Sequence, residues 1–246
     1  MTTPQTSEAQ GATGDTVEVS VVVPVYNEQD NVAPLADEIR AAMERTGRPW
    51  ELIYVDDGSS DRTAEICEGL EGVRLVRHAH NLGQSAATVT GIRAARGETI
   101  VTLDGDGQND PASIPELLAA LETHDVAQGI RAKRRDTLWR RFGSRLAWLV
   151  RNLVVRDGIK DIGCSLRAFP RDVALWLPPF DGLHRLMPAL FVFLGLRVRQ
   201  VETNHRPRTA GVSKYGNLKR GARGLFDLLG LLWLKRRMIS PRGRLR

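Results

Sequence analysis

The stretch from Thr99 to Pro111, TIVTLDGDGQNDP, is an apolar run that ends in two aspartates one residue apart. The short β-branched run is typical of a buried strand. In extended chain Asp104 and Asp106 point to the same side, and Gly105 between them lets a ligand approach the backbone. Gln108 adds a neutral oxygen, and such oxygens suit Mg²⁺ or Mn²⁺. The stretch therefore indicates a metal site, with a solvated polar turn as the alternative.

Apolar strands and amphipathic helices alternate regularly on both sides of this stretch. The expected strands span 19–23, 52–55, 73–76, 99–103 and 126–129, and the expected helices 30–44, 60–70, 84–95 and 111–121. Such alternation predicts an α/β fold with an open, mostly parallel sheet flanked by helices. The later chain is less regular, with helices expected at 138–155 and 183–194 and a strand at 196–201.

Polar clusters follow three of these strands. They read Tyr26-Asn27-Glu28, Asp56-Asp57-Gly58 and Asp104-Gly105-Asp106. Ligands of open α/β sheets bind beyond the carboxyl ends of the strands, so the three clusters are expected in one crevice. Their convergence favours the metal site over the polar turn. The pattern is neither a dinucleotide fingerprint nor a Walker sequence.

The positive charge is concentrated at the C-terminus. The chain has 246 residues and a net charge of +6, and residues 235–246 carry six Lys or Arg and no acid. They follow the apolar stretch 224–235, which is too short to span a bilayer. The combination predicts either a helix on an anionic membrane surface or a terminal core helix with a solvated tail. Residues 1–16 are polar and lack the pattern of a signal peptide, which predicts a disordered tail.

A basic segment follows the last expected strand. It contains Arg206, Arg208 and Lys214 in a glycine-containing loop, and cations there suit a diphosphate. The alternatives are a solvated loop or a nucleic-acid contact, but no nucleic-acid module is recognisable and no such partner is expected. The five histidines show no metal spacing and are interpreted as surface or loop residues. The two cysteines are interpreted as structural thiols.

Three motifs in order, VVVPVYNEQDNV, YVDDGSSDRT and LDGDGQNDP, resemble the inverting family-two glycosyltransferases of GT-A (Rossmann-like) fold over residues 19–215. The segments NLGQSAA, GIRAKRRD, DIGCSLRAF and HRPRTAGVSKYG are similar to the branch of dolichyl-phosphate mannose synthases and undecaprenyl-phosphate glycosyltransferases. The Gln-x-x-Arg-Trp signature of processive polysaccharide synthases is absent. The resemblance therefore implies a single sugar transfer rather than polymerisation.

The resemblance implies a role for each matched position. Nucleotide-sugar binding falls to Pro24, Tyr26, Glu28, Val55, Asp56, Asp57, Gly105, Arg131 and Ser213. Metal binding falls to Asp104, Asp106 and Gln108, and catalysis to Asp104, Asp106, Arg208 and Lys214. The family usually has alanine where this chain has Gly105, a change expected to be tolerated.

The implied enzyme uses Mg²⁺ or Mn²⁺ to transfer a sugar from a nucleotide-diphosphate sugar to a polyprenyl phosphate, with inversion. The alternative within the class is a hydroxyl acceptor, for which Asp161 is the candidate base. A non-catalytic nucleotide-sugar-binding module is the alternative outside it. We expect a tail (1–16), a GT-A domain (17–215) and a C-terminal amphipathic extension (216–246). The extension would hold the enzyme peripherally at the cytoplasmic face of the membrane, directly or through a membrane protein.

Overall fold

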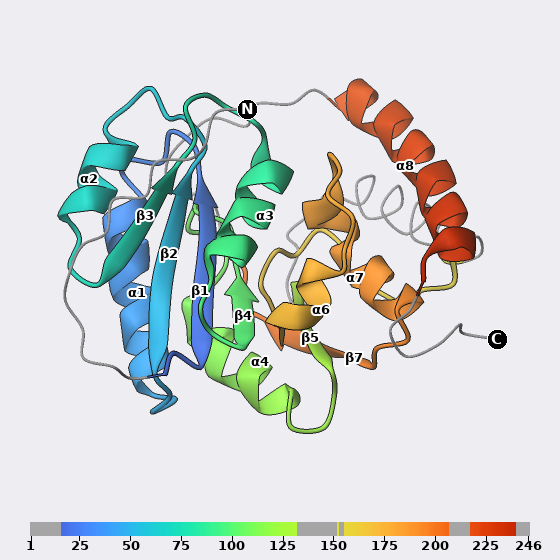
Figure 1. The fold of residues 1–246 in the computed structure, drawn as a ribbon, viewed down its shortest axis with the longest axis horizontal. Coiled ribbons are helices and arrows are strands. Elements are labelled where there is room, and N and C mark those ends of the chain that lie inside the picture. Colours follow the sequence, from blue (N-terminus) through green and yellow to red (C-terminus); the bar gives the residue numbers. More distant parts are fainter. Residues whose placement is uncertain (1–15, 132–151, 153–154, 207–216, 240–246) are drawn as a thin grey trace.

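The computed structural model describes residues 16–131, 152, 155–206 and 217–239 (Figure 1). Seven strands form one sheet in the order β3-β2-β1-β4-β6-β5-β7. Their bounds are β1 (Val19–Val25), β2 (Trp50–Asp56), β3 (Val73–Arg77), β4 (Thr99–Thr102), β5 (Val126–Arg131), β6 (Arg167–Pro170) and β7 (Val198–Thr203). β6 pairs antiparallel with β4 and β5, and the other pairings are parallel.

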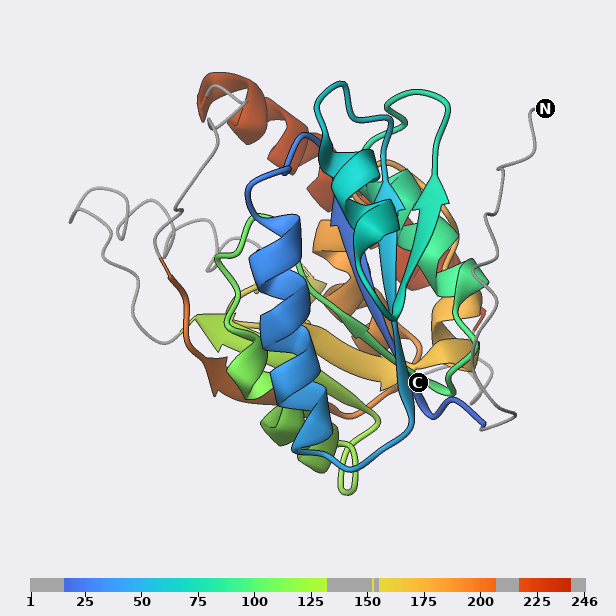
Figure 2. The same ribbon diagram turned by 90° about the vertical axis from the view of Figure 1, so that its left-hand side faces the viewer.

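Helices cover both faces of the sheet and make a three-layer sandwich (Figures 1 and 2). The described helices are α1 (Val32–Glu44), α2 (Thr63–Gly69), α3 (Gln84–Ala94), η1 (Pro111–Ser113), α4 (Ile114–Ala120), α6 (Arg171–Leu175), α7 (Leu183–Phe193) and α8 (Asn217–Arg237). One core cluster joins the sheet to α1, α2 and α4, and a second joins it to α3, α6 and α7. The mostly parallel α/β fold predicted from the alternation is confirmed.

The first strand shows how the sequence builds these two layers. Val19, Val21 and Val23 pack in one cluster while Val22 packs in the other, as the two-residue period of a strand requires. The strand continues past Pro24, where the sequence predicted its end. The Val22 carbonyl accepts a hydrogen bond from the Leu103 amide on the β4 side. Pro24 lies two residues further along the strand, so its backbone nitrogen points to that same side, beyond the end of β4. A proline is tolerated there because no strand partner needs its missing N–H.

The later chain departs more from the prediction. β6 and α6 were not predicted, and α8 is longer than the apolar stretch that suggested a helix. α8 lies on the outside of the molecule, on the far side of α7 from the sheet (Figure 1). Its buried Leu231 joins the second core cluster, and Asp227 pairs with Arg185 of α7 at 3.0 Å. The helix expected at 138–155 lies almost wholly outside the described residues.

Candidate functional site

The expected crevice lies where the strand order reverses. β1 is flanked by β2 and β4, so the loops after these three strands meet at one edge of the sheet. This is the switch point at which open α/β sheets bind ligands. All three polar clusters identified in the sequence follow strands of this group.

The loops after β1 and β2 are joined by hydrogen bonds. The Asn27 amide donates to the Ser59 hydroxyl at 2.9 Å, and the Ser60 amide donates to Asn27 Oδ1 at 2.8 Å. The Glu28 amide donates to the Thr63 hydroxyl at 2.8 Å. Asn27 adopts φ +54°, a left-handed conformation that asparagine tolerates better than most residues. The two loops therefore form one surface, which carries Tyr26 and Glu28 of the predicted nucleotide-binding residues.

Asp57 organises the loop between β3 and α3. Its carboxylate accepts from the amides of Leu82 and Gly83 at 2.9 and 2.8 Å, and from His78 Nδ1 at 2.8 Å. His78 is a loop residue, as interpreted, but it is not on the surface: it is buried between Asp57 and Thr90. Asp57 thus has a structural role that the sequence did not reveal, and its contact with a base stays a prediction.

The other predicted nucleotide-binding residues differ in exposure. Pro24, near the end of β1, and Tyr26 and Glu28, in the loop after it, are partly exposed. Val55 is fully buried in the second core cluster, so a base could reach only its main chain. Asp56 is also fully buried: its Oδ1 accepts from the Ser59 amide, and its Oδ2 has no hydrogen-bond partner. A supporting role suits Asp56 better than direct contact with a ligand.

The metal motif begins just after β4, with Leu103 between the strand and Asp104. Asp104 Oδ1 accepts from Gln84 Nε2 of α3 at 2.6 Å. Asp106 Oδ1 accepts from the main-chain amide of Gln108 at 3.1 Å. Burial, and after it the charge of Asp106, raises the pKa of Asp104 to about 6. Two carboxylates that repel one another gain stability from a shared cation. The Gln108 Nε2 donates to the Arg206 carbonyl at 3.4 Å, which leaves its Oε1 as the atom able to bind a metal.

Gly105 fills a restricted space between the two aspartates. A Cβ atom there would lie 2.6 Å from Val25 Cγ1 and 3.1 Å from the Pro24 carbonyl oxygen. Alanine at this position would therefore require Val25 or β1 to shift, whereas glycine fits without any change. Close packing of the motif on β1 explains the glycine.

The donor atoms of this motif fit Mg²⁺ or Mn²⁺. Mg²⁺ is commonly bound by one or two carboxylates, with water and substrate phosphates completing its octahedron. The described residues hold no group of three or more His, Cys, Asp or Glu side chains suited to a metal. Two carboxylates and one amide oxygen therefore suit an ion that is completed by a donor diphosphate, rather than one held by protein alone.

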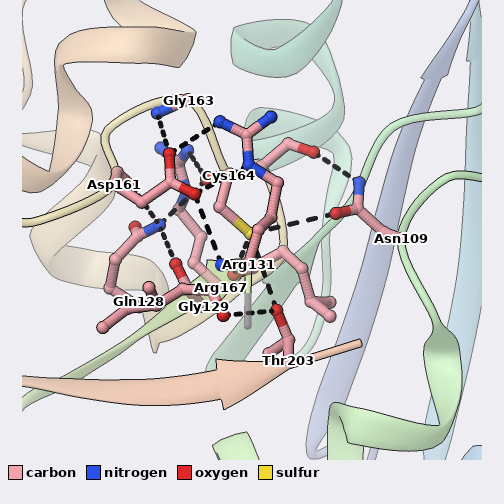
Figure 3. Close-up of polar contacts among 12 residues, drawn as sticks. Asn109, Gln128, Gly129, Arg131, Asp161, Gly163, Cys164, Arg167 and Thr203 are labelled. Carbon is pink, nitrogen blue, oxygen red and sulfur yellow. Dashed lines mark hydrogen bonds and ion pairs between the residues drawn. The ribbon is translucent and has the colours of Figure 1, made fainter. Parts of the chain in front are cut away.

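Arg131 and Asp161 form a bidentate ion pair at the end of β5 (Figure 3). Arg131 Nε lies 2.7 Å from Asp161 Oδ2, and a guanidinium NH2 lies 2.7 Å from Oδ1. The two side chains are only 15% and 10% exposed. A base must take up the proton of the acceptor hydroxyl, and protonating Asp161 would break this ion pair. Asp161 is therefore a poor base for a hydroxyl acceptor. The role of Arg131 near the sugar or phosphates stays a prediction.

A small pocket beside Asp104 contains two groups that sequence reasoning missed. Arg167 of β6 and His184 of α7 line it together with Gln84 and Ser165. Arg167 is buried, and it donates to the carbonyls of His184 and Cys164 at 2.9 and 2.6 Å. Its burial lowers its pKa to about 10. His184 departs from the interpretation of the histidines as surface or loop residues, because it lies in helix α7 and lines this pocket. Its only sequence signal is a position in an apolar helix.

Arg206 does not have the role expected of the basic segment. Its guanidinium is held by Glu38 at 2.9 and 2.8 Å and by Asp110 at 2.8 Å, so it does not face a diphosphate. Burial opposes the shift, but the hydrogen bonds that Arg206 donates to Glu38 and the charge of Asp110 raise the pKa of Arg206. Arg208, Ser213 and Lys214, the predicted diphosphate-binding residues, lie outside the described residues.

The family model "Glycosyl transferase family 2" matches residues 20–175. The dodecaprenyl-phosphate galacturonate synthase of Rhizobium johnstonii is 38% identical over 237 residues, covering 92% of this chain and 69% of the relative. The undecaprenyl-phosphate 4-deoxy-4-formamido-L-arabinose transferase of Pectobacterium carotovorum is 35% identical, covering 83% and 64%. The chain belongs to glycosyl transferase family 2. It spans just under two thirds of the arabinose transferase.

The fold agrees with this assignment. Glucosyl-3-phosphoglycerate synthase from Mycobacterium tuberculosis, solved with Mn²⁺ and uridine diphosphate, has a TM-score of 0.65 and 21% identity. The match covers 92% of this chain and 86% of that one. The expected GT-A fold and the resemblance to the polyprenyl-phosphate branch of family two are confirmed.

Proposed function

We propose that this chain transfers a sugar from a nucleotide-diphosphate sugar to a polyprenyl phosphate, with inversion at the anomeric carbon. The observation that carries the proposal is the gathering of Asp104, Asp106 and Gln108 beside the joined β1 and β2 loops at the switch point. The two relatives, a dodecaprenyl-phosphate galacturonate synthase and an undecaprenyl-phosphate arabinose transferase, support this acceptor class.

The chemistry of the acceptor explains why no strong base is needed. A phosphate monoester is already anionic at neutral pH, whereas a sugar hydroxyl must lose a proton as it attacks. The pairing of Asp161 with Arg131 favours the phosphate over the hydroxyl acceptor. Asp104, Asp106 and Gln108 would hold Mg²⁺ or Mn²⁺, which when bound neutralises charge on the departing diphosphate. Arg208, Ser213 and Lys214 are proposed to bind the same diphosphate.

The described part of α8 supports contact with a membrane surface. Phe226, Leu229 and Trp233 are 77%, 60% and 63% exposed, and their spacing places them on one side of the helix. Three cations follow in its last turn. Lys235 donates to the Val155 carbonyl at 2.6 Å, so Arg236 and Arg237 are the ones proposed to meet the membrane. Among the described residues, no helix is both long and apolar enough to cross a bilayer. We propose that α8 lies on an anionic membrane, with its apolar side chains in the headgroup region.

This assignment gives each part of the chain a proposed role. Residues 17–215 would form the catalytic GT-A domain, residues 216–246 the membrane-associating extension, and residues 1–16 a tail. The cytoplasmic face of the membrane is the proposed location, because nucleotide-sugar donors and the lipid phosphate would meet there. A membrane protein partner is the alternative means of attachment.

Sugar transfer to lipid tests the proposed activity. Purified protein would be incubated with Mn²⁺ or Mg²⁺, undecaprenyl phosphate and a panel of labelled GDP- and UDP-sugars. We expect label from one donor to enter the organic phase. Asp106→Ala should reduce this transfer about 1000-fold, a loss typical of removing a central electrostatic group. Asp37→Ala on the exposed face of α1 is the matched control and should leave the rate unchanged.

The other acceptors predict different results. Label that stays in the aqueous phase on an added glycan would replace the lipid phosphate with a hydroxyl acceptor. Donor binding without transfer to any acceptor would support the non-catalytic module. Sedimentation with lipid vesicles tests the membrane contact. Trp233→Ser should reduce sedimentation with phosphatidylglycerol vesicles. Wild-type protein that sediments equally with neutral phosphatidylcholine vesicles would contradict the electrostatic contribution.

A further inference from the structure

The chain leaving β7 pairs directly with the metal loop. Asn109 and His205 form an antiparallel bridge. The Arg206 amide donates to the Gln108 carbonyl at 2.9 Å, and Gln108 Nε2 donates back to the Arg206 carbonyl at 3.4 Å. The main chain of Arg206 therefore contacts both the backbone and the side chain of Gln108, and fixes which way the amide oxygen points.

The side chain of Arg206 anchors this pairing to two other elements. It bonds both carboxylate oxygens of Glu38 on α1 and one oxygen of Asp110, which begins η1. In Figure 2 the described end of β7 rises beside α1. Asn204 donates to the second Asp110 oxygen at 3.1 Å. Although burial opposes it, the bonds from Asn204 and Ala112 and the charge of Arg206 lower the pKa of Asp110.

We propose that Arg206 is a positioning residue for the metal site, acting through Gln108. The inference rests on the proposed function, because it assumes that Gln108 binds the ion. Mg²⁺ demands near-ideal octahedral geometry, so an amide ligand must be held in place before the ion arrives. Mutating a group that orients a metal ligand through a hydrogen bond typically weakens metal affinity about tenfold or more.

The geometry explains why arginine stands at this position. A planar guanidinium can bond two carboxylates in different directions at once, whereas a lysine ammonium is a point charge on a flexible stem. Arg206 bridges Glu38 of α1 and Asp110 at the start of η1, two elements that are far apart in the sequence. Lysine would keep the charge but hold one carboxylate at a time.

Direct Mn²⁺ binding tests the inference without depending on turnover. The free ion is followed by electron paramagnetic resonance, with Mn²⁺ alone and with Mn²⁺ plus UDP or GDP. We expect Arg206→Met to weaken Mn²⁺ binding about tenfold and Arg206→Lys to weaken it less. Arg197→Met removes a similar ion pair, with Asp125, at the opposite end of β7. It is the matched control and should bind Mn²⁺ as the wild type does.

A double-mutant cycle separates positioning from a general structural effect. If Arg206 acts through Gln108, then Arg206→Met adds little to the loss caused by Gln108→Ala. Fully additive losses, or wild-type affinity in Arg206→Met, would overturn the inference. Should Arg206→Met fail to fold, the shape-conserving Glu38→Gln carries the test. It should weaken binding about threefold, since Asp110 still holds the guanidinium, and unchanged affinity there would overturn the inference.

The outcomes also distinguish this inference from the proposed function. Wild-type protein that binds Mn²⁺ but transfers no sugar to lipid would overturn the acceptor and leave the role of Arg206 standing. Wild-type protein that binds no Mn²⁺, with or without nucleotide, would overturn the metal site and this inference together.

Discussion

The two sides of the crevice are held together by different chemistry. Around β1 and β2, main-chain amides and small polar side chains join the loops, as in the bonds of Asn27 with Ser59 and Ser60. Around β5 and β7, arginine–carboxylate ion pairs join the segments, as in Arg131–Asp161 and Arg206–Glu38. Neutral bonds to main chain fix a shape whatever the charge of the ligand. Ion pairs instead hold the loops through two opposite charges, so removing one partner leaves the other charge uncompensated.

The largest expected effect lies on the β2 side, at Gly58. Gly58 has φ +72°, and a Cβ there would lie 2.6 Å from the main-chain carbon of His80. Gly58→Ala should therefore lower the free energy of unfolding by about 4 kcal/mol, through backbone strain and a collision that no side-chain movement relieves. Urea denaturation followed by circular dichroism measures the change.

Gly47 supplies the control for this substitution. It has φ +64°, but nothing lies within 4 Å of the Cβ that alanine would add. Gly47→Ala should cost only about 1 kcal/mol, the strain of a left-handed conformation alone. Equal losses in the two variants would mean that the close approach of the two loops is not what holds this side of the crevice.

The next effect lies on the opposite side, in the Arg131–Asp161 pair. Asp161→Asn keeps an oxygen for the Gly163 amide, which donates to Asp161 Oδ1 at 3.1 Å, but leaves a mostly buried guanidinium without its counter-charge. We expect a loss of about 3 kcal/mol in the free energy of unfolding, as for breaking a buried pair. Adding Arg131→Met should restore about half of it. A double variant no more stable than the single one would show that charge balance is not the reason for the loss.

The same contrast explains what the sequence could reveal. The first five strands, their helices and the metal motif follow from local periodicity and from polar residues at strand ends, which are properties of neighbouring positions. The pairing of Arg206 with Glu38 joins residues 168 positions apart, so no local pattern contains it. Arg206 was accordingly grouped with Arg208 and Lys214 as a phosphate-binding cation, an interpretation that its carboxylate partners contradict.

β6 illustrates a different limit. It has only four residues, and its position between β4 and β5 depends on tertiary pairing rather than on its own composition. Because the sequence does not predict β6, it does not predict that Arg167 lies beside Asp104. Single histidines are harder still, because one residue carries no period. The buried position of His78 and the partly buried position of His184 emerge only when separate elements come together.

The smallest expected effect lies at the seam between the two sides, where α3 meets α7. The Nδ1 of His184 lies 2.7 Å from the Ser85 hydroxyl, and that hydroxyl accepts from the Gly182 amide at 3.0 Å. Burial, followed by the charges of Arg185 and Arg167, lowers the pKa of His184 to about 4. The unfolded chain binds a proton on this residue near pH 6.5 and the folded chain does not. Stability from His184 is therefore complete above about pH 6.5 and is lost as the pH falls toward 4.

We expect this loss to be on the order of 2 kcal/mol between pH 7 and 4. The raised pKa of Asp104 acts in the opposite sense over much of the same range, so the wild-type profile alone does not isolate the histidine. The difference between wild type and His184→Gln does, because both carry the same Asp104. That difference should shrink as the pH falls from 7 to 4, measured by urea denaturation at each pH. A constant difference would mean that His184 titrates alike in the folded and unfolded chains, and that the seam is held by packing rather than by a neutral imidazole.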